Sequence, residues 1–147
     1  MRLLLQRVSR ASVRIDGTVV GEIGPGLLAL VGIGHDDTQD IAAALARRTV
    51  ELRIFEDDEG RTNRSLADVG GSLLAVSQFT LYAATRKGRR PSFLDAAPPE
   101  LGQQLYTAYA DAVAALGIPV ARGVFGAEMA VELVNDGPFT IWLDSAA

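Results

Sequence analysis

The sequence predicts a single α+β domain, in which an antiparallel or mixed β-sheet carries two main helices packed on one face. Two observations support this fold class. Strand-like runs alternate with two long segments of helical periodicity, in the order β, α, β, α, β. The chain of 147 residues also contains no internal repeat, linker or low-complexity tract. A chain of this length buries roughly two-thirds of its unfolded surface, so we expect residues 1–147 to form one domain.

The first part of the chain is predicted to form a hairpin and a buried strand. Apolar and polar residues alternate over residues 2–8 and 12–15, as they do in a half-buried strand. Asp16-Gly17 is a strong hairpin-turn signal, so we expect the chain to return over residues 18–23. The run 27–31 is apolar throughout and predicts a buried strand.

Two helices and the remaining strands follow. Asp37 or Thr38 can cap a first helix that runs to about Arg53. Pro98-Pro99-Glu100 suits the first turn of a second helix, and Gly117 is suited to closing it. The other strands are expected over residues 53–55, 73–82, 120–125, 129–135 and 138–143, with a polar and basic loop over residues 83–97.

Composition excludes several classes of protein. Hydrophobic residues make up 48% of the chain and charged residues 22%, which is ordinary for a globular protein. The chain has no cysteine and one histidine, which excludes disulfides and metal sites built on several such ligands. No apolar run approaches the roughly 18 residues of a membrane span, and the first residues do not resemble a signal peptide. We therefore expect a cytoplasmic protein with no membrane contact, no metal and no cofactor.

His35 is the only residue on which a Ser-His-Asp triad could be built. It stands directly before Asp36-Asp37 in a loop-like stretch, which favours a solvent-facing position at the start of the first helix. The carboxylates of residues 56–59 lie on a glycine-containing turn, and no glycine-rich segment has the lysine of a nucleotide-binding loop. Conventional side-chain catalysis is thus poorly supported.

Two polar clusters interrupt segments that otherwise look like strands. The first is Ser77-Gln78-Phe79-Thr80, and the second is Asn135-Asp136-Gly137-Pro138. Polar groups in a half-buried strand need partners or serve a ligand. Proline cannot donate to a sheet ladder, so the Gly137-Pro138 step indicates that backbone is presented to something. The two clusters together predict a functional site, whereas an ordinary strand-edge turn is the alternative for the Gly-Pro step taken alone.

The strand period assigns the first cluster to two faces. It places Gln78 and Thr80 together, pointing into a pocket, and places Phe79 on the opposite face, packed inside. A threonine hydroxyl is a weak nucleophile without a base, and no histidine or lysine adjoins Thr80 in the sequence. A cross-strand hydrogen bond is the simpler role for this hydroxyl.

Charge is distributed unevenly along an acidic chain. The net charge of −4 argues against a general nucleic-acid-binding protein. Residues 86–90, however, read Arg-Lys-Gly-Arg-Arg and place four cations in five residues. This cluster is either a local phosphate contact or a solvated loop.

The two polar clusters resemble the two signature motifs of the D-aminoacyl-tRNA deacylases. The matching segments are Ser77-Gln78-Phe79-Thr80-Leu81 and Asn135-Asp136-Gly137-Pro138-Phe139-Thr140. Other segments agree with the family in the same order along the chain: residues 6–13, 24–28, 53–55, 90–93 and 123–129. The resemblance therefore runs from end to end and rests on several separated motifs.

The resemblance implies an editing hydrolase that cleaves the ester between a D-amino acid and the terminal adenosine of tRNA. It further implies activity on glycine mischarged onto alanine tRNA, and chemistry assisted by the 2′-hydroxyl of the terminal ribose. Such chemistry suits a site without histidine, cysteine or metal, since backbone groups and the substrate itself then do the work.

The resemblance also implies roles for particular residues in a homodimer. The catalytic site is expected at Ser77, Gln78, Phe79 and Thr80, and substrate contacts are expected from Phe125 and Met129. Gly137 and Pro138, joined by a cis peptide bond, would enter the partner's pocket as a chirality filter that blocks an L side chain. Phosphate contacts to tRNA are expected from Arg86, Lys87, Arg89 and Arg90.

Two other functions stay open on the residues alone. One is a hydrolase of another small ester that uses Thr80 as its nucleophile. The other is a non-enzymatic nucleic-acid-binding dimer that uses the cations of residues 86–90, although the acidic character of the chain argues against it.

Overall fold

The first strand, β1 (Arg2–Ile15), is long enough to pair with three other strands. In the computed structural model, which describes residues 1–147, β2 (Thr18–Ile23) pairs with the second half of β1 and β3 (Gly26–Gly32) with its first half. β8 (Ala130–Asp144) runs along the other side of β1. All three pairings are antiparallel, so β1 is the strand on which one half of the sheet is assembled.

Two parallel pairings complete a six-stranded mixed sheet. β6 (Ser72–Ser77) pairs with β3, and β7 (Val120–Arg122) pairs with β6. β3 and β6 are almost fully buried, as the apolar run 27–31 predicts for a strand in the middle of a sheet.

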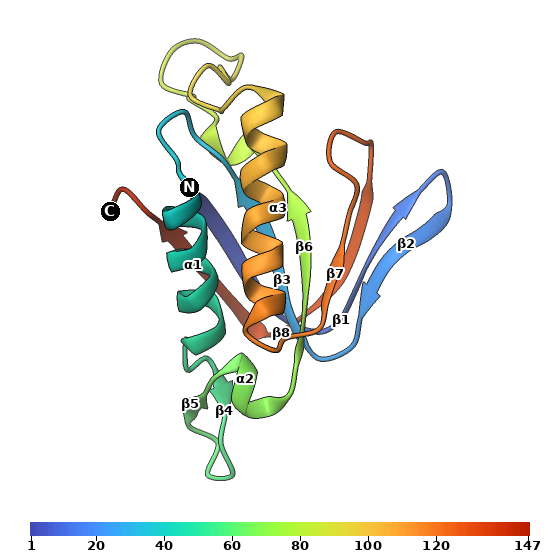
Figure 1. The fold of residues 1–147 in the computed structure, drawn as a ribbon. Helices are drawn as coiled ribbons and strands as arrows, with labels where there is room; N and C mark the ends of the chain where they lie inside the picture. The colour runs from blue at the N-terminus through green and yellow to red at the C-terminus, as the bar shows by residue number, and fades with distance from the viewer.

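Helices α1 (Gln39–Glu51) and α3 (Pro99–Ala115) lie side by side on one face of this sheet (Figure 1). Between the helices and the sheet lies a core of 23 buried residues, which includes Leu3, Leu27 and Tyr109. The predicted fold class, a mixed sheet with two main helices on one face, is therefore confirmed. Neither helix has the length and hydropathy that crossing a membrane requires.

Short sequence signals correctly predicted where several helices and strands begin or end. Of the two expected caps of α1, Thr38 is the one used, and its hydroxyl accepts the N–H of Ile41 at 3.3 Å. Asp16 and Gly17 have φ values of 48° and 78°, the left-handed conformation that a tight hairpin turn requires.

The segment after α1 differs from the expected single strand. β4 (Phe55–Glu56) pairs with a second short strand, β5 (Thr62–Arg64), and a one-turn helix, α2 (Leu66–Val69), follows. The signal for α2 was present in the sequence, because Ser65 and Asp68 have the spacing of a capping box and form both of its hydrogen bonds.

The C-terminal strands also differ from the prediction. The strand expected over residues 120–125 ends at Arg122, and the two strands expected over 129–135 and 138–143 are one continuous strand, β8. Because β8 pairs only with β1, the missing N–H of Pro138 leaves no internal ladder incomplete. The β1–β8 register shifts twice, between Gln6 and Val8 and between Val8 and Arg10, and this accommodates the irregular segment.

Candidate functional site

The first polar cluster does not continue its strand. β6 ends at Ser77, and residues Phe79–Tyr82 form a turn of 3₁₀-helix, η1. The N–H of Gln78 still donates to the carbonyl of Val31 at 2.7 Å, whereas the Gln78 carbonyl already accepts the N–H of Leu81 at 3.2 Å. The expected alternation of side chains between two sheet faces is therefore wrong from Gln78 onward.

The turn brings Gln78 and Thr80 together in another way. The side-chain amide of Gln78 donates to Oγ1 of Thr80 at 2.5 Å. No histidine, lysine or carboxylate lies within hydrogen-bonding distance of this hydroxyl. Thr80 is exposed and has no base beside it, so the local geometry gives it no activation as a nucleophile.

A cavity of about 570 Å³ opens where β6 ends, between the sheet and α3. Ser77, Gln78 and Phe79 line it from one side, and Phe125 and Met129 line it from the loop after β7. Five residues singled out from two distant parts of the sequence thus share one cavity, whose walls are mostly apolar.

Phe79 stands at the rim of this cavity rather than inside the core. Its side chain is 58% exposed, which corrects the expectation that it packs inside. It contacts the edge of Phe93, with ring centroids 5.1 Å apart and planes at 73°. Two aromatic rings therefore border the opening.

Several lining residues were not expected from the sequence. Tyr106 of α3 faces the cavity, and its hydroxyl donates to the carbonyl of Ala75 at 2.8 Å. Burial raises the pKa of this hydroxyl, so Tyr106 acts as a neutral donor. Gly102, one turn earlier, lies under the Phe125 ring, and a Cβ there would be 3.3 Å from that ring. A glycine within an otherwise regular helical pattern was the available signal for this close approach.

The second polar cluster lies elsewhere on the molecule. Gly137 and Pro138 are exposed residues of β8 and do not line the cavity of their own chain. Their peptide bond is cis, as the family resemblance implies. The side-chain amide of Asn135 donates to the carbonyls of Arg7 and Phe139, at 2.9 and 3.0 Å. The bond to Phe139 links the residues on the two sides of the Gly-Pro step.

Arg7 contacts the residues on both sides of the Gly-Pro step, Asp136 and Phe139. It is a buried cation whose Nε donates to the carbonyl of Asp136 at 3.0 Å and whose Nη1 donates to the carbonyl of Ile54 at 2.7 Å. Its guanidinium also lies 4.7 Å from the centroid of the Phe139 ring. Sequence reasoning missed Arg7, although an arginine that continues the inward-facing alternation of Leu3 and Leu5 was a usable signal.

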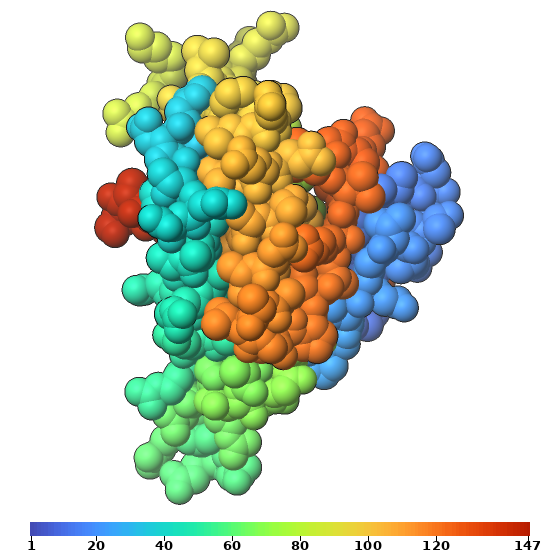
Figure 2. Space-filling model, viewed as in Figure 1, coloured from blue at the N-terminus to red at the C-terminus, as the bar shows by residue number.

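The four cations expected to contact tRNA lie on the loop that precedes Phe93. Arg86, Lys87, Arg89 and Arg90 are all exposed and form no ion pair within the chain. Figure 2 shows this loop projecting from one end of the molecule. Two backbone hydrogen bonds between Ala84 and Ser92 join the ends of this loop. The next residue, Phe93, lines the cavity.

Other candidate chemistry finds no support in the geometry. His35 is exposed, and its Nε2 lies 2.7 Å from the carbonyl of Leu94 rather than beside a serine. No group of three or more acidic or histidine side chains is arranged to hold a metal ion. A more open groove of about 890 Å³, between α1 and the end of β8, contains none of the candidate residues.

The chain has many close relatives. The family described as D-Tyr-tRNA(Tyr) deacylase matches residues 4–144. A protein of Thermomicrobium roseum named D-aminoacyl-tRNA deacylase is 62% identical over 146 residues, which cover 99% of this chain and 95% of that protein.

Solved structures show the same likeness. A structure named c-Myc DNA Unwinding Element Binding Protein superposes with a TM-score of 0.94 at 39% identity, over 100% of both chains. A probable eukaryotic D-amino acid tRNA deacylase has the same fold, with a TM-score of 0.83 at 20% identity over 97% of each chain. The chain therefore belongs to the D-Tyr-tRNA(Tyr) deacylase family.

Proposed function

We propose that this protein is a D-aminoacyl-tRNA deacylase, an editing hydrolase that releases a free D-amino acid and tRNA. The observation that carries the proposal is the shared cavity, in which Ser77, Gln78 and Phe79 of one motif meet Phe125 and Met129 of another segment. Family membership and the names of the relatives support the reaction. The walls of the cavity contain no histidine and no carboxylate, so the chemistry has to rest on neutral groups.

The cavity is suited to the charged 3′ end of tRNA. Its volume of about 570 Å³ lies in the range of small-molecule sites. Aromatic side chains at its rim and wall offer faces on which an adenine ring can stack. The adenosine would enter between Phe79 and Phe125, and the ester would then lie against the turn that begins at Gln78.

Catalysis in this proposal uses backbone donors and the substrate. The first N–H groups of a helical turn have no acceptor within that turn. The amides of Phe79 and Thr80 therefore suit the ester carbonyl, whose oxygen gains negative charge in the transition state. The 2′-hydroxyl of the terminal ribose assists the attack of water, and the protein contributes position.

Chiral selection is assigned to Gly137 and Pro138 of the second subunit of a homodimer. The pair is exposed and lies away from the cavity of its own chain, which suits an action across a subunit interface. Rigid backbone placed where an L side chain would lie excludes the L enantiomer by steric clash. Glycine has no side chain to exclude, so glycyl-tRNA is hydrolysed as well.

The test is a deacylation assay on tRNA charged with D-Tyr, L-Tyr or glycine, combined with sedimentation to measure the oligomeric state. We expect rapid release of D-Tyr and glycine, a rate for L-Tyr close to the spontaneous one, and a dimer. A 2′-deoxy terminal adenosine should abolish most of the rate. Equal rates for D-Tyr and L-Tyr would contradict the filter, and full activity on the 2′-deoxy substrate would contradict RNA assistance.

A second candidate is binding of nucleic acid without catalysis. The solved structure at 39% identity is named for binding a DNA unwinding element, and residues 86–90 form an exposed cationic loop. Absence of deacylation, together with tight and salt-sensitive binding to DNA, would favour this function over the hydrolase.

A further inference from the structure

The turn η1 is held at its C-terminal end by a side chain from the start of the chain. Nη1 of Arg2 donates to the carbonyl of Leu81 at 2.9 Å. The last carbonyls of a helical turn have no partner inside the turn, so this hydrogen bond satisfies a group that would otherwise depend on water. Arg2 is itself fixed by Asp144, whose Oδ2 accepts from Nε at 3.2 Å.

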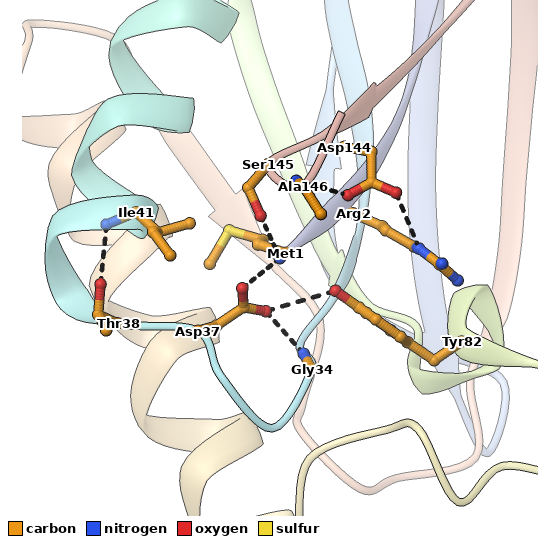
Figure 3. A network of polar contacts seen from close by, with 10 residues as sticks. All are labelled: Met1, Arg2, Gly34, Asp37, Thr38, Ile41, Tyr82, Asp144, Ser145 and Ala146. Carbon is orange, nitrogen blue, oxygen red and sulfur yellow. Dashed lines mark hydrogen bonds and ion pairs between the residues drawn. The ribbon is translucent and has the colours of Figure 1, made fainter.

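Arg2 also holds the next residue of the turn. Its guanidinium lies 4.3 Å from the centroid of the Tyr82 ring, within the range of a cation–π contact. The Tyr82 hydroxyl points toward Asp37, with 3.5 Å between the two oxygens (Figure 3). Burial and the Asp37 carboxylate both raise the pKa of Tyr82, so the ring stays neutral under the arginine.

Asp37 is a fixed anchor for this ring. Its Oδ2 accepts the N–H of Gly34 at 2.7 Å, and its other oxygen pairs with the α-ammonium of Met1 (Figure 3). Gly34 leaves the space that the Tyr82 ring fills, since a Cβ there would lie 2.9 Å from the ring. The end of η1 is thus clamped between Arg2 on one side and Asp37 on the other.

We infer that Arg2 is a positioning residue for deacylation, which sets the place of the Phe79 and Thr80 backbone amides through its contacts with Leu81 and Tyr82. This inference rests on the proposed function. The carbonyl of Val31 in β3 fixes the other end of the segment by accepting the Gln78 N–H, so Phe79 and Thr80 lie between two anchors only a few residues apart. Loss of the hydrogen bond from Arg2 to Leu81 would therefore move the backbone amides of Phe79 and Thr80, which are the groups assigned to the ester carbonyl.

The experiment compares Arg2→Met, Arg2→Lys and Arg10→Met in the full-length protein. Arg10 is the matched control, because it lies on the same strand, is exposed, and forms one surface ion pair, with Glu132 at 3.0 Å. Each variant is measured for the single-turnover rate and KM on D-Tyr-tRNA, for melting temperature, and for amide hydrogen exchange at Leu81 and Ala83. Those two amides donate to Gln78 and Thr80 within the turn and so report its integrity.

A misplacement of about 1 Å costs on the order of 100-fold in rate. We expect Arg2→Met to lower the single-turnover rate by about 10- to 100-fold with little change in KM, and to speed exchange at Leu81 and Ala83. Arg2→Lys should be intermediate, because one ammonium cannot reach the Leu81 carbonyl and Asp144 together. Arg10→Met should match wild type in rate and exchange.

Three outcomes would overturn the inference: a rate for Arg2→Met within twofold of wild type, exchange at the turn no faster than wild type, or a rate loss that Arg10→Met shares. If Arg2→Met does not fold, the comparison of Arg2→Lys with wild type decides in the same way. Failure of the proposed function is distinguishable, because wild type itself would then show no D-selective release. In that case faster exchange alone would support the clamp, and unchanged exchange would reject it.

Discussion

The side-chain amide of Gln78 donates to the hydroxyl of Thr80 across 2.5 Å. The Thr80 oxygen thereby receives a hydrogen bond from a neutral amide, which cannot remove a proton from it. A nucleophilic hydroxyl needs a general base at that position. The pair therefore holds the turn and orients the Thr80 hydroxyl, and it does not prepare Thr80 for attack.

We expect Thr80→Ala to keep most of its activity, with a loss of about tenfold or less, because the variant loses only one orienting contact. A nucleophile would instead cost several orders of magnitude. The measurement is the single-turnover rate on D-Tyr-tRNA, with Thr107→Ala on the exposed face of α3 as control. A covalent acyl-enzyme on Thr80, or near-complete loss in a folded variant, would favour the nucleophile mechanism.

We expect Arg89→Gln combined with Arg90→Gln to weaken tRNA binding and to flatten its dependence on salt. Each phosphate contact contributes a slope of about 0.7 to 0.9 in the logarithm of affinity against the logarithm of salt concentration. The D-to-L rate ratio should stay unchanged. The control removes two exposed arginines that already pair with glutamates, Arg47 and Arg61. An unchanged salt slope would show that the loop is only solvated.

Elements with local signals could be predicted from the sequence. The Asp16-Gly17 turn, the Thr38 cap and the apolar run of β3 each depend on residues within a few positions of one another. The two polar clusters could be found for a related reason, because polar residues and a Gly-Pro step stand out within apolar runs. The sequence therefore predicted the fold class and five of the residues that line the cavity, Ser77, Gln78, Phe79, Phe125 and Met129.

The end of β6 could not be predicted, because distant residues determine it. The chain turns after Gln78 where Gly32 and Gly34 leave room for Leu81 and Tyr82, and a Cβ on either glycine would approach those side chains to about 3 Å. A period-2 pattern carries no information about that space. The role of Arg7 was hidden in the same way, since its partners Ile54 and Asp136 lie far from it in the sequence.

We expect Asp68→Asn to lower the melting temperature at pH 7 by about 2 °C, because it weakens the capping box of α2. Hydrogen bonds from the N–H and hydroxyl of Ser65 hold the pKa of Asp68 below its ordinary value of 3.8. A lowered pKa in the folded state stabilises the protein above that ordinary value, and the contribution disappears as the pH falls through the folded-state pKa. The gap between variant and wild type should therefore begin to narrow below about pH 4 and close once the pH lies below the folded-state pKa.

Thermal melts from pH 7 to pH 2.5 would measure this gap. Asp95→Asn is the control, since Asp95 is exposed and forms no hydrogen bond or ion pair through its side chain. A gap that stays constant down to the lowest pH would show that the Asp68 charge contributes nothing to the cap.

We expect Gly137→Ala to disturb the proposed chirality filter. Gly137 has φ of 135°, where L side chains are strained, and a Cβ there would lie 3.0 Å from Nη2 of Arg7 and from the N–H nitrogen of Phe139. Arg7 is buried and bonded to two carbonyls, so the β8 segment has to shift instead. Rates on D-Tyr-tRNA and glycyl-tRNA should fall together by about tenfold, because both substrates use the same backbone surface. Displacement of that surface also reopens space for an L side chain, so the D-to-L rate ratio should drop.

Gly24→Ala is the matched control, since a Cβ there meets nothing within 4 Å. A folded, dimeric Gly137→Ala variant with the D-to-L ratio of wild type would place the filter elsewhere.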